Sequence, residues 1–91
     1  MSWSYEEYDL NGTTTSGRLN TVRLLVGDTD STDQQVQNEE IEFALSENNN
    51  NVYYTGAWTA RTIAAKYSRQ VTTQLSGALS ADYSDLAKQY K

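Results

Sequence analysis

The sequence predicts a mainly α-helical fold, a small helical bundle of three to four helices in one domain covering residues 1–91. Apolar residues recur every three or four positions in three successive segments, which is typical of one face of a helix. Gly or Asn follows the first two of these segments, where helices commonly end. The chain has 91 residues and no cysteine, so we expect a thin core that no disulfide reinforces.

Residues 1–17 are expected to form an extended N-terminal arm and a polar loop. Trp3, Tyr5 and Tyr8 alternate only in part with polar residues, and the NGTTTSG that follows has the composition of a turn or linker. Tyr and Trp suit surfaces that are packed on one side and wet on the other. The three aromatic residues are therefore candidates for contact with the chain's own domain or with a neighbouring subunit.

The helical core is predicted at residues 18–71, and its first helix is short. Thr15 or Ser16 can cap its start, and Gly27 can end it in a left-handed conformation. The residues expected to form its apolar stripe are Leu19, Val22, Leu25 and Val26.

A second helix is predicted after the acidic stretch GDTDSTDQQVQNEE. Asn38 is a favourable N-cap, and Glu39 and Glu40 lie in the first turn, where the helix dipole favours negative charge. The run ENNNN then ends the helix, because Asn tolerates left-handed geometry. The expected buried edge is Ile41, Ala44 and Leu45, with Phe43 to one side.

The third helix, at about residues 52–71, has the most regular pattern and is predicted to be the spine of the domain. Its apolar residues have spacings of 4, 3, 4, 3 and 4, and its small middle residues would let another helix approach closely. Trp58 and Ile63 widen this apolar face, and Arg61, Lys66 and Arg69 are expected on the solvated side. The stripe consists of Tyr53, Ala57, Ala60, Ala64, Tyr67 and Val71.

Residues 72–91 are predicted to form an extended segment followed by the start of a C-terminal helix. LSADY, residues 79–83, alternates apolar and polar residues as a half-buried strand does, so a strand or hairpin is expected at about residues 72–83. Ser84 can cap the last helix, which carries Leu86 and Tyr90. We expect this helix to be truncated at Lys91.

The acidic stretch invites comparison with a calcium-binding EF-hand loop. Asp28, Asp30 and Glu39 match positions 1, 3 and 12 of such a loop. Position 6 is Asp33, however, where the sharp turn needs glycine, and the chain contains no second hand. We therefore interpret the stretch as a polar connection between two helices, with metal binding by these acids as the weaker alternative.

Composition argues against an enzyme and against a nucleic-acid reader. The chain has no His, the commonest general base, and no Ser-centred nucleophile motif. Its net charge of −5 is divided unevenly, since residues 1–50 carry −8 and residues 51–91 carry +3. This division suits electrostatic complementarity between one copy and the next. No catalytic residue, cofactor or membrane segment is expected.

Four stretches, in order, resemble the head–tail connector (adaptor) family of tailed bacteriophages. They are MSWSY, TVRLLVGDTDSTDQQVQNEEIEFAL (residues 21–45), TARTIAAKYSRQV (residues 59–71) and LSGALSADYSDLAKQYK (residues 75–91). The resemblance covers nearly the whole chain. Members of the family often carry Pro near the first helix, and this chain has none.

The resemblance implies a structural virion protein made in the host cytoplasm. Such adaptors form a homo-oligomeric ring of twelve copies beneath the portal protein, receive a stopper or tail-completion protein on the far side, and let phage DNA pass through the lumen. The alternative is a small acidic, calcium-responsive or regulatory protein-interaction module. Candidate interaction residues are Trp3, Tyr5, Tyr8, Trp58, Arg61, Lys66, Arg69, Tyr83 and Tyr90.

Overall fold

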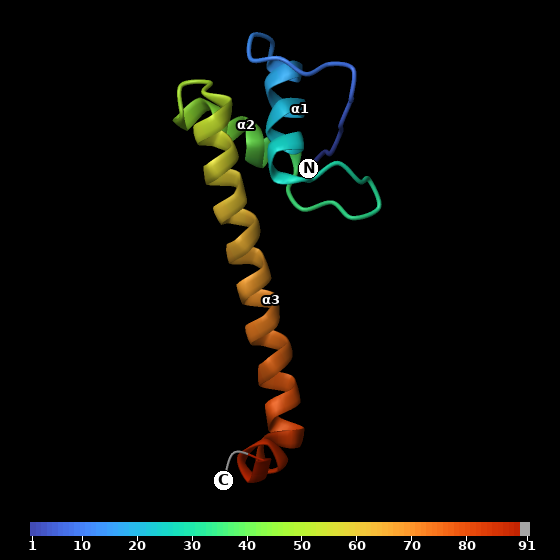
Figure 1. Cartoon of the computed structure of the whole chain (residues 1–91), viewed down its shortest axis with the longest axis vertical. Coiled ribbons are helices and arrows are strands. Elements are labelled where there is room, and N and C mark those ends of the chain that lie inside the picture. The colour runs from blue at the N-terminus through green and yellow to red at the C-terminus, as the bar shows by residue number, and fades with distance from the viewer. Residues whose placement is uncertain (90–91) are drawn as a thin grey trace.

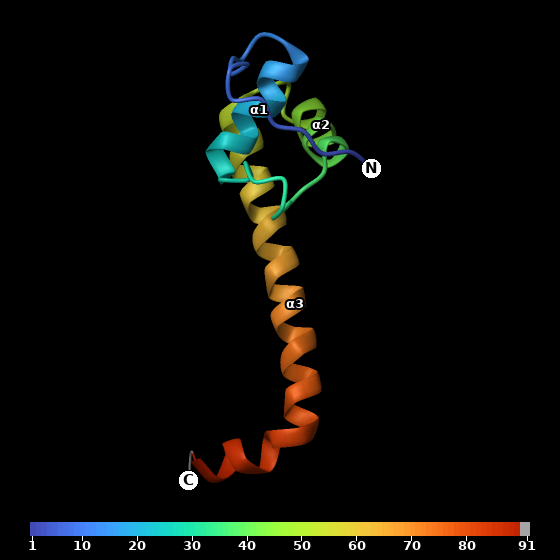
Figure 2. The same cartoon turned by 90° about the vertical axis from the view of Figure 1, so that its right-hand side faces the viewer.

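A computed structural model describes residues 1–89, and it describes side chains for residues 1–71. It contains α1 (Thr15–Val26), α2 (Asn38–Glu47) and α3 (Val52–Gln89). The two short helices pack against the first half of α3, and the rest of α3 projects away from them (Figures 1 and 2). We call residues 1–66 the head. The molecule measures 57 × 25 × 21 Å, and the predicted small helical bundle is confirmed.

Helix α1 begins and ends with side-chain and backbone caps. The Thr14 hydroxyl accepts a hydrogen bond from the Gly17 N–H at 3.0 Å, so the N-cap is Thr14, and the predicted Thr15 or Ser16 is wrong. The reason is conformational: Thr14 is extended, whereas the next residues are already helical. Gly27 has a φ of 76° and ends the helix as predicted.

The N-cap of helix α2 lies one residue earlier than predicted. Gln37 is the N-cap and forms a capping box with Glu40, whose carboxylate accepts the Gln37 N–H at 3.0 Å. The prediction of Asn38 as N-cap is wrong because the Asn38 amide instead binds the N-terminal arm and α1. The helix ends as predicted in an Asn-rich turn, where Asn49 and Asn50 have φ values of 54° and 61°.

The apolar core joins all three helices and the loop between α1 and α2. Its members are Leu19, Val22, Val36, Ile41 and Leu45, with Val52 and Ile63 packed against them. The predicted buried edge of α2, including Ala44, is confirmed.

The predicted stripe of α1 is wrong in its second half. Leu25 is half exposed and Val26 is only partly buried, whereas Asn20 and Arg23 are buried. Polar residues are tolerated there because the N-terminal arm lies along α1 and supplies hydrogen-bonding groups. The Asn20 amide, for example, donates to the carbonyl of Asp9 at 3.0 Å and accepts the N–H of Glu6 at 3.1 Å.

The predicted buried stripe of α3 is also wrong, because every residue in it is exposed. The side of α3 that faces the head instead carries Thr55, Gly56 and Thr59. Gly56 allows α1 to approach closely: a Cβ atom there would lie only 3.2 Å from a methyl group of Leu25. Small residues therefore permit the close helix contact, as predicted, but on a different side of α3.

The predicted strand or hairpin at residues 72–83 is not confirmed, because α3 continues as a helix to Gln89. The separate C-terminal helix is likewise the end of α3, which bends in its last turns (Figure 2). The alternation that suggested a strand covers only five residues. Leu75, Leu79, Tyr83 and Leu86 also recur at spacings of 4, 4 and 3, which a helix satisfies. Tyr90 and Lys91 lie outside the described residues.

Two buried threonines of α3 provide a test of the core. The Thr55 and Thr59 hydroxyls are buried without a hydrogen-bond partner. We expect Thr59→Val, which replaces the hydroxyl by a methyl group of similar shape, to raise the free energy of unfolding by about 1 kcal/mol, measured by urea denaturation. Thr62→Val is the matched control, since the Thr62 hydroxyl donates to the Trp58 carbonyl at 3.2 Å. A Thr59→Val variant no more stable than this control would contradict the described packing.

Candidate functional site

A buried ion pair joins α1 to the start of the acidic stretch. The Arg23 guanidinium contacts the Asp28 carboxylate, and both side chains are fully buried. Arg23 also donates to the Val36 carbonyl at 2.9 Å and to the Asn38 side chain at 2.6 Å. Burial lowers the pKa of Arg23 below its ordinary value, and Asp28 opposes that shift. The pair therefore joins α1, the following loop and the start of α2.

The same ion pair holds the N-terminal arm. Arg23 Nε donates to the Ser4 carbonyl at 2.7 Å, and its guanidinium lies 4.6 Å from the centre of the Trp3 ring. The Trp3 indole N–H in turn lies 3.3 Å from both carboxylate oxygens of Asp28. The arm therefore packs, at Trp3, against α1 and the loop that follows it.

The arm is fixed at a second point near its first residue. Glu39 accepts hydrogen bonds from the Ser2 N–H at 2.9 Å and from the Ser2 hydroxyl at 2.8 Å. These bonds stabilise the ionised carboxylate and lower the pKa of Glu39 to about 2. The Asn38 N–H also donates to the Ser2 carbonyl at 2.6 Å.

The three acids of the calcium hypothesis do not converge on one point. Beyond Arg23 and Trp3, the Asp28 carboxylate accepts the backbone N–H groups of Gln35 and Val36 at 3.0 and 3.1 Å. Asp30 accepts from the N–H and hydroxyl of Thr32 in a local turn, and these bonds lower its pKa. Within the described part of the chain, no three acidic, His or Cys side chains are grouped as a metal site. The polar-connection interpretation fits this geometry.

An open groove on the other side of α2 is the strongest candidate for an interaction site. The Phe43 and Trp58 rings meet edge to face, with centroids 6.5 Å apart, and both remain substantially exposed at 59% and 42%. Two adjoining hollows of about 320 and 340 Å³ share Trp58 and Thr62. We call these hollows the aromatic groove. Its lining residues are Met1, Glu39, Glu40, Phe43, Trp58, Arg61, Thr62 and Ala65.

The aromatic groove has an acidic end and a basic end. Glu40 forms an ion pair with Lys66 at 2.7 Å, which links α2 to α3. Burial raises the pKa of Glu40, but the hydrogen bonds from Lys66 and from the Gln37 N–H outweigh burial, so the net shift is downward. Arg61 is exposed and lines the opposite end. An aromatic centre between charges of opposite sign is typical of a protein contact.

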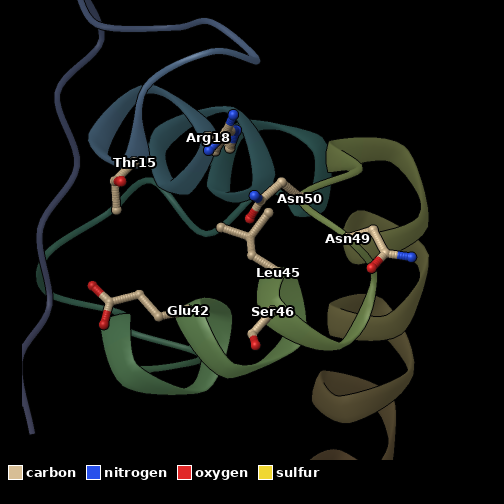
Figure 3. A pocket seen from close by; sticks show the side chains of 7 residues that line it. All are labelled: Thr15, Arg18, Glu42, Leu45, Ser46, Asn49 and Asn50. Atoms are coloured by element: carbon tan, nitrogen blue, oxygen red, sulfur yellow. The ribbon is translucent and has the colours of Figure 1, made fainter.

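A separate hollow of about 300 Å³ lies between α1 and the C-terminal end of α2 (Figure 3). Thr15 and Arg18 of α1 face Glu42, Leu45 and Ser46 of α2 across this hollow, and Asn49 and Asn50 close one side. Arg18 Nε donates to the Gly12 carbonyl at 3.0 Å. The hollow contains an acid and hydroxyls, but no His to activate them, and nothing in its lining resembles a catalytic site.

The predicted interaction residues are distributed over several surfaces. Trp3 is partly buried against Arg23 and Asp28, Tyr5 is also partly buried, and Tyr8 is 88% exposed on the arm. Trp58 and Arg61 line the aromatic groove, and Lys66 is paired with Glu40. Arg69 is exposed on α3 beyond the head. Tyr83 lies on α3 beyond the described side chains, and Tyr90 lies outside the described residues.

Two residues of these sites, Arg23 and Phe43, were not predicted as site residues from the sequence. Arg23 follows Leu19 by four positions, so a base on the apolar side of α1 was a visible signal of a buried ion pair. Phe43 contacts Trp58 from another helix, and its neighbours in the sequence give no sign of that contact.

Comparison with known proteins gives no match, since no family model, curated protein or solved structure is similar to this chain at the significance required. Among the described residues, α-helices fall short of the length and apolar content needed to cross a membrane.

The buried ion pair predicts that substitutions of two neighbouring acids change the free energy of unfolding by very different amounts. We expect Asp28→Ala to lower the free energy of unfolding by about 3–5 kcal/mol, because Arg23 is left buried without its counter-ion. Asp30→Ala, an exposed acid two residues away, is expected to lower it by less than about 1 kcal/mol. Urea denaturation followed by tryptophan fluorescence measures both changes. If Asp28→Ala is too unstable to fold, Asp28→Asn provides the comparison, and equal effects at positions 28 and 30 would contradict the buried pair.

The low pKa of Glu39 predicts an acid-sensitive arm. Because the folded pKa is depressed, the contact stabilises the folded chain fully above the ordinary value near 4.5, and this contribution is lost as the pH falls toward 2. In an NMR titration over that pH range, we expect the chemical shift of the Ser2 amide to change as Glu39 is protonated. Glu39→Gln should abolish the response, whereas Glu42→Gln on the same helix should keep it. A Glu39 midpoint near 4.5 would show that the contact does not form.

Proposed function

We propose that the chain is a structural virion protein, a head–tail adaptor that forms a ring beneath the portal, joins capsid to tail and lets DNA pass. The proposal rests on the resemblance of four ordered sequence stretches to the connector family of tailed phages. The observation that carries it in the structure is how much apolar surface the chain leaves uncovered. Large apolar residues are exposed on α1, α2 and α3, as expected for a subunit completed by its neighbours.

The chemistry of the described residues supports an assembly role. Hydroxyls and acids occur in the hollows, but the chain has no His, and Asp28, the most buried acid, is held by Arg23 and Trp3. An acid so engaged is a structural part of the head. The calcium-responsive alternative therefore loses the residue on which it most depended.

The aromatic groove is the surface that we assign to a second virion protein, either the portal or the stopper. Trp58 is a favourable anchor, because large aromatic side chains in a partly enclosed pocket supply much of the binding energy in protein interfaces. Arg61 and Glu39 at the two ends of the groove can fix the orientation of a partner with complementary charges.

The uneven charge of the chain supports both the ring and the passage of DNA. A ring is built from unlike surfaces that meet at each contact, and residues 1–50 with −8 can face residues 51–91 with +3. The total of −5 also disfavours tight binding of the phosphate backbone. DNA could then slide through the lumen without sequence-specific contacts.

Imaging with a purified portal ring tests the proposal. We expect wild-type chain mixed with the portal to add a ring of density at one end in negative-stain class averages. Trp58→Ala should weaken this binding by at least about tenfold, the scale of a truncated interface anchor. Tyr8→Ala, an exposed aromatic residue outside the groove, should bind as wild type. A wild-type chain that never joins a portal would overturn the proposed function, and equal binding by the two variants would overturn the role of the groove.

A further inference from the structure

The stripe predicted to be the core of α3 is instead an uncovered surface. Tyr53 is 76% exposed, Tyr67 52% and Val71 48%, and the three alanines between them are also exposed. We call the six residues Tyr53, Ala57, Ala60, Ala64, Tyr67 and Val71 the α3 seam. At about 100° per residue, the seam centre lies roughly 120° around the helix from the side that faces the head.

The spacing of the seam specifies the kind of partner. The intervals alternate between 4 and 3, so every second residue of the seam is seven positions further on, as at Tyr53, Ala60 and Tyr67. This seven-residue repeat keeps one apolar line facing another helix in a left-handed pair. Alanine at Ala57, Ala60 and Ala64 permits the axes to approach at the close end of the usual 8–10 Å range. The partner is therefore a helix that presents the same repeat.

The chain itself supplies such a helix in a second copy, and residue sizes favour the antiparallel orientation. If two seams pair about a two-fold axis between Ala60 and Ala64, those alanines face each other. Ala57 then faces Tyr67 of the second copy, and Tyr53 faces Val71. Large residues oppose small ones. A parallel pair in register would instead place Tyr on Tyr and Ala on Ala, which separates the helices unevenly.

An apolar margin beside the seam extends the surface that a second copy could cover. Leu25 lies against Gly56, whose neighbours on that side of α3 are Tyr53 and Ala60. Leu24 and Leu25 are themselves 50% and 48% exposed. The seam therefore continues onto α1 at the head end of α3.

We propose that the free chain forms an antiparallel two-fold dimer through the α3 seam. The pairing does not depend on the proposed function, and it differs from a ring contact, because an isologous pair closes on itself whereas a ring needs unlike surfaces. If both proposals hold, the dimer is the state of the chain before it meets the portal, and the seam becomes available again when a ring forms.

Single-cysteine variants test the orientation, because the 91 residues contain no native cysteine. We expect a mixture of Ala60→Cys and Ala64→Cys, distinguished by mass, to give a disulfide between unlike variants on mild oxidation. Each variant alone should crosslink at least about tenfold less, because position 60 of one copy faces position 64 of the other. Strong crosslinking of each variant with itself would indicate a parallel pair and overturn the proposal.

Sedimentation equilibrium tests the surface independently. Ala64→Glu places a charge in the seam and should raise the dimer dissociation constant by about tenfold or more, because the charge would be buried in the contact. Ala65→Glu is the matched control, an exposed alanine of α3 outside the seam, and should change it by less than about twofold. Circular dichroism verifies that both variants fold.

The outcomes separate the two proposals. A wild-type chain that stays monomeric at high micromolar concentration overturns the dimer, even if it still joins a portal. Equal dissociation constants for Ala64→Glu and Ala65→Glu overturn the seam as the contact. A dimer that is disrupted by Ala64→Glu supports the seam whether or not the portal is bound.

Discussion

The fold of this small protein depends on the buried contact between Arg23 and Asp28. An ion pair of this kind stabilises a structure only when hydrogen bonds satisfy the remaining donors and acceptors. Here those bonds come from the arm, the loop and the start of α2, which are joined at one point. A domain of 91 residues has little apolar core, and a polar centre with every partner in place compensates by fixing how the parts are arranged.

That polar centre also determines what α3 can do. Once α1 and α2 are fixed, they cover one side of α3, and its threonines and glycine suit that close contact. The aromatic groove and the α3 seam then lie on other sides of the same helix. A single helix thus serves as a structural support, a candidate site for a foreign partner and a candidate site for another copy. The second half of α3 projects beyond the head (Figure 1).

Much of the fold could be predicted from local chemistry. Gly27 and the Asn-rich turn end their helices as expected, and the buried edge of α2 is correct, because these features depend on backbone conformation and on a short pattern. The aromatic groove could be predicted only in part. Trp58 and Arg61 were candidates, but the contact between Phe43 and Trp58 depends on how α2 packs against α3.

The sequence by itself determined the helical class, the C-terminal ends of α1 and α2, and the presence of a regular seam on α3. Only the tertiary structure decided which side of α3 is buried, and that Asp28 is an internal counter-ion. The physical reason is twofold. Periodicity identifies an apolar line on a helix but not the element that covers it. An acid at a position that matches a calcium-binding loop can bind either a metal or a buried base. The turn at Gly27 brings Asp28 against Arg23, so Asp28 binds a buried base and not a metal.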